Sequence, residues 1–226
     1  MRSDPAARST RACPNESVAA RCLILKRARL DRANQLVARF KYMTLIRSLP
    51  ENATLADLRG ADPELFEKLR PYGHQLMRGP SPLTPGEREL IAAYVSGVNS
   101  CRFCHGTHSR AAQAFGVPEE TIRTLLDDIE FAPVPDRMKP ILRFVRKLTE
   151  TPSRMTAADA AAVYDAGWPE QALIHAIAVC AYFNNMNRLV EGAGIVGTAE
   201  HYAAGAERLV AEGYLMGPES ISHRAK

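Results

Sequence analysis

The stretch Thr84-Pro-Gly-Glu-Arg-Glu-Leu-Ile-Ala-Ala-Tyr-Val-Ser-Gly-Val-Asn-Ser-Cys101 predicts a helix with a sharp start and a sharp end. Thr84 can cap the helix, Pro85 suits its first position, and Glu87 three residues after the cap completes a capping box. The apolar run over residues 90–95 indicates that the helix is buried on most sides. This stretch therefore predicts a core helix, and the chemistry-bearing residues of the chain follow directly after it.

The next segment, Cys101-Arg-Phe-Cys104-His-Gly-Thr-His108, is expected to open a second helix. Asn99 and Ser100 offer a break and a cap, which places Cys101 in the first turn. The helix should end near Phe115, because Gly116 suits the left-handed turn that closes many helices.

The rest of the chain is also predicted to be helical. Proline and glycine fall between periodic segments, and no alternating run of β-branched residues indicates a sheet. Apolar residues at helical spacing predict a helix over 21–47, and the region from Pro50 to Pro82 is expected to form short helices and turns. Further helices are expected at 119–128, 136–150, 156–166 (with Thr156 as cap and Asp159 at the third position), 168–190 and 198–212.

The fold class is therefore all-α. The segments Leu90-Ile-Ala-Ala-Tyr-Val and Leu173-Ile-His-Ala-Ile-Ala are similar, and each precedes an asparagine-containing turn. This similarity predicts an internal repeat of a helical hairpin, of which the second copy lacks the cysteines. We expect a loosely ordered basic segment over residues 1–20 and a single helical domain over residues 21–226.

Composition limits the location and the partners. No stretch approaches the roughly 18 consecutive apolar residues of a membrane span, and the N-terminus lacks the apolar run of a secretory signal. Residues 1–47 carry eleven Lys/Arg against three Asp/Glu, and we interpret this excess as a solvated segment rather than a nucleic-acid arm or an organellar address. Five cysteines without such a signal indicate a reducing compartment, so a cytoplasmic location with no nucleic-acid or membrane partner is expected.

The two cysteines and the histidine form a candidate redox site. The helix N-terminus favours a thiolate at Cys101 or Cys104, and His108 lies one turn after Cys104 on the same face. Cys101 could attack a sulfenic acid on Cys104 and close a disulfide. If the two helices pack as a hairpin, Glu89 could reach the cysteine–histidine pair as a proton relay, and its carboxyl pKa should be raised by an apolar pocket.

Other interpretations of this cluster remain open at this point. Cys101-x-x-Cys104-His105 also fits a c-type haem attachment sequence. Cys101, Cys104, His105 and His108 could be four zinc ligands, although structural zinc sites usually take two pairs from separate elements. A thioredoxin-like site would need a βαβ context, which is absent, and two buried structural cysteines are the plainest alternative.

The segment from Leu76 to His108 resembles the alkylhydroperoxidase D-like proteins, and most closely their peroxidase-related branch within the carboxymuconolactone decarboxylase-like superfamily. The later Tyr-Phe-Asn-Asn-Met-Asn-Arg-Leu at 182–189 is similar to a second signature of that branch. The resemblance covers residues 40–210 and implies an all-helical fold with an internal repeat. It also implies homo-oligomers (dimers, trimers or hexamers) and thiol peroxidase activity without haem, metal or another cofactor.

In that family scheme Cys104 is the peroxidatic cysteine, Cys101 resolves it, and Glu89 and His108 relay protons. The substrate would be a small hydroperoxide, and an unidentified dithiol or protein would supply the electrons. This chain has Phe103 where relatives carry histidine or tyrosine between the cysteines, which removes one relay group. The alternative functions are a general disulfide reductase and a non-enzymatic helical oligomer that senses redox state or is structural.

The remaining singled-out residues are assigned structural roles. Cys13 and Cys22 have no partner at close spacing, and Cys180 lies in an apolar run typical of a core. His175 is expected to be a buried histidine with its hydrogen bonds satisfied. The three asparagines at 184, 185 and 187 must find partners if they are buried, so they should pin a turn or an inter-subunit contact.

Overall fold

The computed structural model describes residues 44–215, all of which belong to one compact unit. The predicted boundary at residue 20, the cysteines Cys13 and Cys22, and all but the end of the helix predicted over 21–47 lie outside the described residues. Residues 44–47 themselves form bends and a turn rather than a helix.

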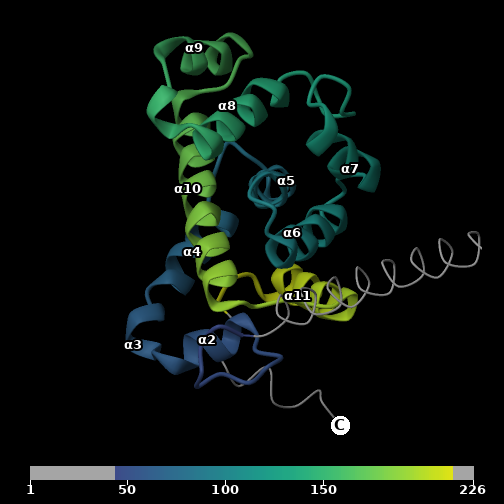
Figure 1. Ribbon diagram of the computed structural model, residues 1–226. Coiled ribbons are helices and arrows are strands. Elements are labelled where there is room, and N and C mark those ends of the chain that lie inside the picture. Colours follow the sequence, from purple (N-terminus) through teal and green to yellow (C-terminus); the bar gives the residue numbers. More distant parts are fainter. Residues whose placement is uncertain (1–43, 216–226) are drawn as a thin grey trace, which may run out of the picture. The chain divides into compact units, whose positions relative to one another are not determined.

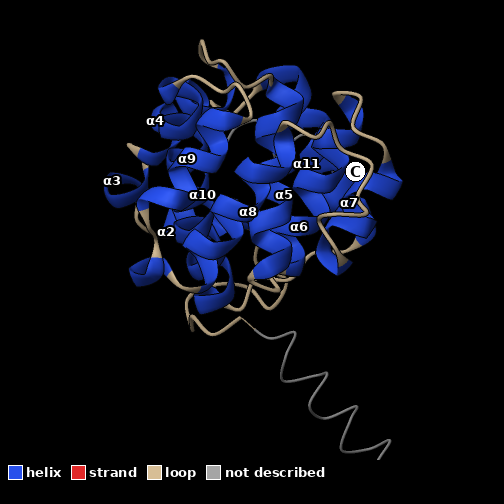
Figure 2. Cartoon of the chain, turned by 90° about the horizontal axis from the view of Figure 1, so that it is seen from above, coloured by secondary structure: helices blue, strands red, loops and turns tan. Residues whose placement is uncertain are grey.

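The described part of the chain consists of helices and connecting turns, and no strand occurs among residues 44–215 (Figure 2). The predicted all-α class is thereby confirmed. The elements in chain order are α2 (Leu55–Ala61), α3 (Pro63–Phe66), α4 (Leu69–Arg78), α5 (Pro85–Val98), α6 (Arg102–Ala114), α7 (Glu119–Asp127), α8 (Met138–Glu150), the 3-10 helix η1 (Pro152–Arg154), α9 (Ala157–Asp165), α10 (Glu170–Ala193) and α11 (Ala199–Glu212).

Helix α5 is the centre of the core. Figure 1 shows it end-on, with α6, α7, α8 and α10 around it. Every residue from Leu90 to Ser96 is buried, as the apolar run predicts. The expected capping box is present, because the Thr84 side chain accepts from the Glu87 backbone and the Glu87 carboxylate accepts from the Thr84 backbone. A buried, firmly capped α5 gives the site a fixed support.

The turn between α5 and α6 positions the cysteine pair. Ser100 adopts a left-handed conformation with φ of 57°, its backbone N–H donates to Gly97 O (2.8 Å), and that of Cys101 donates to Ser96 O (2.9 Å). These two bonds are those of the helix-closing turn in which the chain reverses after a left-handed residue. Cys101 consequently precedes α6 as its N-cap, one residue earlier than predicted, and Cys104 is the third residue of the helix.

The later helices start and end close to the predicted positions. Gly116 has φ of 91° directly after α6, and the Thr156–Asp159 capping box opens α9. Helix α10 continues three residues beyond the predicted end at 190 and stops at Gly194, which is left-handed. The internal repeat stays a prediction. No helix within residues 44–215 is long and apolar enough to cross a bilayer.

Candidate active site

Cys101 and Cys104 lie side by side in a small apolar cluster. Their neighbours there are Leu58 and Phe66 from the α2–α3 region and Val190 near the end of α10. Cys101 is 0% exposed and Cys104 is 3% exposed, and neither forms a disulfide. The two thiols are thus shielded from water yet joined by their own hydrogen bond.

The surroundings distinguish the two thiols. The hydrogen bond from the Cys101 thiol lowers the pKa of Cys104, and the charge of His108 and a hydrogen bond from Asn187 act in the same direction against the effect of burial. The pKa of Cys101 is strongly raised, because its thiol donates to Cys104, because it is buried, and because the Glu191 carboxylate accepts a hydrogen bond from it. Of the two thiols, Cys104 therefore has the lower pKa and loses its proton first.

A buried carboxylate lies behind His108. His108 Nδ1 donates to Glu89 Oε2 at 2.7 Å, and Glu89 is fully buried on α5. The other carboxylate oxygen accepts from Arg78 Nη2 at 2.7 Å and from the Tyr214 hydroxyl at 3.0 Å. The predicted hairpin contact between α5 and α6 is present. With Nδ1 bound to Glu89, Nε2 is the ring nitrogen left to exchange a proton.

The predicted rise in the pKa of Glu89 is wrong. Burial is the largest single influence and does raise it, but the charges and hydrogen bonds of His108 and Arg78 outweigh burial and leave the carboxyl pKa below its usual value. Glu89 therefore stays ionised near neutrality. Its pairing with His108 fixes the orientation of the imidazole and places a negative charge beside Nδ1.

An amide network holds the cysteine turn against α10. Asn99 Nδ2 donates to Asn187 Oδ1 (2.9 Å) and to Asn184 Oδ1 (3.1 Å), and Asn187 Nδ2 donates to Ser96 Oγ (3.0 Å). Asn187 also lowers the pKa of Cys104 through a hydrogen bond. Two of the three asparagines therefore pin the turn, whereas Asn185 is exposed.

We expect Asn187→Ala to raise the pKa of Cys104 and to lower the free energy of unfolding by about 1–3 kcal/mol. Cys104 loses a hydrogen-bond donor, and the half-buried Asn99 amide and the buried Ser96 hydroxyl lose a partner. The pH dependence of Cys104 alkylation and urea unfolding measure the two effects. Asn185→Ala removes an exposed amide on the same helix and should change neither quantity. Equal alkylation profiles for the wild type and Asn187→Ala would exclude Asn187 from the site.

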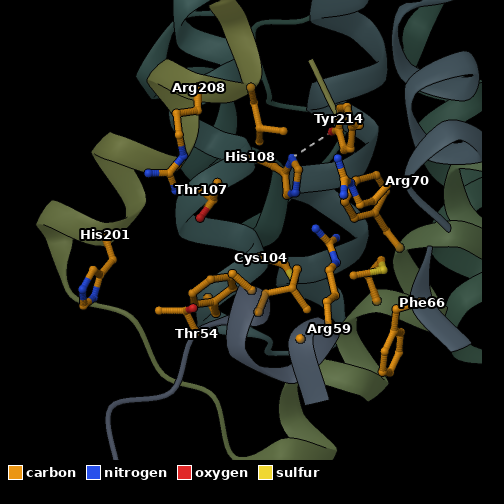
Figure 3. A pocket seen from close by; sticks show the side chains of 18 of the residues that line it. Thr54, Arg59, Phe66, Arg70, Cys104, Thr107, His108, His201, Arg208 and Tyr214 are labelled. Atoms are coloured by element: carbon orange, nitrogen blue, oxygen red, sulfur yellow. Dashed lines mark hydrogen bonds between the residues drawn. The ribbon is translucent and has the colours of Figure 1, made fainter. Parts of the chain in front are cut away.

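A cavity of about 390 Å³ opens beside Cys104 (Figure 3). Cys104, Thr107 and His108 from α6 face it, together with side chains from α2–α4, α10 and α11. Cys101 is not among its lining residues. A small molecule in this cavity would thus lie beside Cys104, whereas Cys101 does not border it.

Phe103 contributes apolar surface to this cavity. Its ring packs edge-on against Tyr202, with centroids 6.1 Å apart. A tyrosine hydroxyl that could replace the missing relay group is present elsewhere: Tyr214 donates to Glu89 and lies 3.4 Å from His108 Nδ1. Burial and the Glu89 charge raise the pKa of Tyr214 well above its usual value, so the hydroxyl stays protonated as a donor.

The other histidines and cysteines have separate surroundings. His105 Nδ1 bonds to Ala93 O (2.9 Å) rather than pointing to the cysteines, and no group of three or more metal-binding side chains occurs within residues 44–215. The zinc arrangement considered from the sequence is therefore not assembled. Cys180 is buried in the main core, as predicted. His175 is only partly buried and its Nδ1 has no hydrogen-bond partner in the described part, so the predicted satisfied histidine is wrong.

Comparison with known proteins identifies a similar family and similar solved structures. Residues 63–146 match the carboxymuconolactone decarboxylase family. The crystal structure of an uncharacterized peroxidase-related protein from Silicibacter sp. TM1040 superimposes with a TM-score of 0.61 at 24% identity, covering 66% of this chain and 78% of that one. A comparison with curated proteins gives no significant match.

A second solved structure is similar to this chain to the same degree. It is described as an alkylhydroperoxidase AhpD core, an uncharacterized peroxidase-related protein from Ralstonia eutropha JMP134, with a TM-score of 0.60, 24% identity and coverage of 66% and 78%. The chain thus has the alkylhydroperoxidase-like helical fold. Residues 63–146 are similar to the carboxymuconolactone decarboxylase family, in agreement with the resemblance seen in the sequence.

Proposed function

We propose that the protein is a cysteine-dependent peroxidase that reduces organic hydroperoxides through the Cys101–Cys104 pair. The observation that carries this proposal is the asymmetry of the two thiols. Cys104 borders the cavity and has a lowered pKa, whereas Cys101 lies behind it with a raised pKa. A peroxidatic and a resolving cysteine require this division.

The first step oxidises Cys104. Its thiolate attacks the terminal oxygen of ROOH, the O–O bond breaks, and the leaving alkoxide takes a proton to become ROH. Cys104 becomes a sulfenic acid. We assign the supply of that proton to His108. Its Nδ1 is hydrogen-bonded to Glu89, and its charge lowers the pKa of Cys104. Glu89 itself acts through His108 and keeps its negative charge.

The second step forms the disulfide. The Cys101 sulfur attacks the Cys104 sulfenic acid, an S–S bond forms, and the hydroxyl leaves as water after protonation. Cys101 must lose its proton in this step, and the exposed Glu191 carboxylate that accepts its hydrogen bond offers a route to solvent. A dithiol then reduces the disulfide, returns both thiols and is itself oxidised to a disulfide. Such a cycle needs no cofactor or metal, and it suits a reducing compartment such as the cytoplasm.

Turnover separates this enzyme from a redox sensor. Cumene hydroperoxide should disappear catalytically in the presence of dithiothreitol, with many equivalents consumed per protein chain. Consumption that stops at one equivalent would identify a sensor or a structural pair instead. Reduction of a model disulfide without any peroxide consumption would identify a general disulfide reductase.

The protein is also proposed to form a homo-oligomer. Ile174 and Ile177 on α10 are 50% and 37% exposed, and Phe131 is 82% exposed. A second copy of the chain could bury this exposed apolar surface. The asparagine cluster suggested by the sequence as a contact surface is largely used within the chain. Light scattering should give a mass that is a multiple of the 24.8 kDa chain. A 24.8 kDa monomer at micromolar concentration would contradict this expectation.

A further inference from the structure

Three arginines face the cavity beside Cys104 without a carboxylate partner. They come from three different helices: Arg59 from α2, Arg70 from α4 and Arg208 from α11. Within residues 44–215 none of the three forms an ion pair. Glu67 is the acidic residue of the lining, and it pairs with Lys68. The cavity therefore carries an excess of positive charge.

Arg59 and Arg70 are held close together inside this cavity. In Figure 3 the Arg59 guanidinium points into the cavity, between Cys104 and Arg70. Burial lowers the pKa of Arg59 and the charge of Arg70 lowers it further, while Tyr182 and Cys104 act in the opposite direction. Two cations in one partly buried space repel each other, so an anion between them would relieve that repulsion.

Hydrogen-bond donors on both arginines are unused. The Nε atoms of Arg59 and Arg70 are buried and have no acceptor in the described part of the chain. Arg70 uses one terminal nitrogen for the backbone oxygen of Leu215. A carboxylate is a planar group with two oxygens that matches a guanidinium, and a buried donor without an acceptor costs free energy until one arrives.

The rest of the cavity is apolar. Its walls include Leu55, Phe66, Phe103, Phe183, Met186 and Leu209. A volume of about 390 Å³ lies within the range of cavities that hold small organic ligands. The site therefore combines a cationic corner with a hydrocarbon-compatible space beside a reactive sulfur. This combination fits an amphipathic anion.

We propose that the cavity binds organic hydroperoxides that carry a carboxylate, with the carboxylate on Arg59 and Arg70 and the carbon chain along the apolar wall. This inference rests on the proposed peroxidase function and names its substrate class. The carboxylate is unchanged in the reaction. The terminal peroxide oxygen passes to Cys104, the O–O bond breaks, and the hydroxy acid leaves after its alkoxide takes a proton.

The first arm of the test measures binding without chemistry. Decanoate and decanol are titrated calorimetrically into the Cys104→Ser protein. This binding measurement does not depend on peroxidase activity. Decanoate should bind about tenfold or more tightly than decanol, and Arg59→Gln should remove most of that difference because a charge-assisted pair is lost. Arg154→Gln removes an exposed arginine outside the cavity and should leave binding unchanged. Arg70→Gln is the second cavity variant, and it should weaken decanoate binding to a similar extent.

The second arm measures chemistry. Oxidation of Cys104 by linoleic acid hydroperoxide is compared with oxidation by its methyl ester, and the acid should react faster in the wild type but not in Arg59→Gln. Equal reactivity of acid and ester in the wild type, or equal decanoate and decanol binding, would overturn the inference. If decanoate binding depends on the arginines but neither hydroperoxide oxidises the protein, the anion site is supported and the proposed peroxidase function is wrong.

The third arm distinguishes the substrate from the reductant. The disulfide form is reduced with a carboxylated dithiol and with the corresponding neutral amide. Equal rates with these two reductants support the assignment of the arginines to the hydroperoxide. An Arg59-dependent preference for the carboxylated dithiol, without a preference between hydroperoxide acid and ester, would overturn it in favour of the reductant.

Discussion

Replacing Cys104 by serine is expected to abolish peroxide reduction, whereas replacing Cys101 by serine should leave the first oxidation step intact. Cys104 is the thiol that borders the cavity, and a serine hydroxyl cannot take its place as a nucleophile toward peroxide at neutral pH. Without Cys101 no disulfide can close, so a sulfenic acid should accumulate on Cys104. Dimedone labelling followed by peptide mapping measures that species.

The matched control for the cysteine pair is Cys180→Ser. Cys180 is equally buried, but it lies in the main core near Thr149 and away from the cavity. Its replacement should leave both oxidation steps at the wild-type rate. A sulfenic acid trapped on Cys101 in the Cys104→Ser protein would reverse the two roles.

The second large effect is expected for Glu89→Gln. The amide keeps the shape of the side chain, but it removes the negative charge beside His108 and leaves Arg78 without a counter-charge. Peroxide-driven oxidation of Cys104 should slow by about 10²-fold, the lower end of general acid–base contributions. The free energy of unfolding should fall by about 3 kcal/mol, because one partner of a largely buried ion pair has been removed.

The pH dependence of stability distinguishes the two consequences of this substitution. The pKa of Glu89 is lowered in the folded protein, so its carboxylate stabilises the fold above the pKa of the unfolded chain, and that stabilisation is lost as the pH falls through the folded value. The stabilities of wild type and Glu89→Gln should therefore converge in acid, below about pH 4. Urea unfolding across that range measures the convergence.

Glu87→Gln is the control for this prediction. Glu87 lies in the first turn of the same helix, where its carboxylate accepts from the Thr84 backbone. Its replacement should cost at most about 1 kcal/mol and leave the oxidation rate unchanged. A Glu89→Gln protein that is oxidised as fast as the wild type, at matched folding, would remove Glu89 from the mechanism.

The elements of the fold were predictable because the signals that set them are local. The Thr84–Glu87 capping box, the break at Asn99–Ser100 and the glycine at 116 each act within a few residues. The pairing of Glu89 with His108 also followed from the sequence, because two helices joined by a tight turn must pack against each other. Local rules were sufficient for these features.

The groups that tune the site were not predictable by the same rules. Tyr214 reaches Glu89 from 125 residues away, and Asn99 meets Asn187 across 88 residues. Neither spacing forms a recognisable pattern. The predicted direction of the Glu89 pKa shift was wrong because burial was foreseen, whereas the combined charges and hydrogen bonds of His108 and of Arg78, which lies on a different helix, outweigh burial.

Arg59 is the clearest residue that sequence reasoning missed. It lies on the short helix α2, forty-five positions before Cys104, in a region that the sequence describes only as short helices and turns. A charged side chain there normally indicates a solvated surface. Only the packing of α2 over the cysteine cluster turns the guanidinium toward the cavity.

Oxidising the protein with one equivalent of cumene hydroperoxide and measuring its mass tests whether Cys101 and Cys104 form the redox pair. We expect a loss of two hydrogen atoms per chain. Trypsin cleaves after Arg88, Arg102 and Arg110, so the new disulfide should join the peptide over 89–102, which holds Cys101, to the peptide over 103–110, which holds Cys104. An unchanged mass, or oxidation that maps to Cys13, Cys22 or Cys180 while both of these peptides remain reduced, would show that Cys101 and Cys104 are not the redox pair.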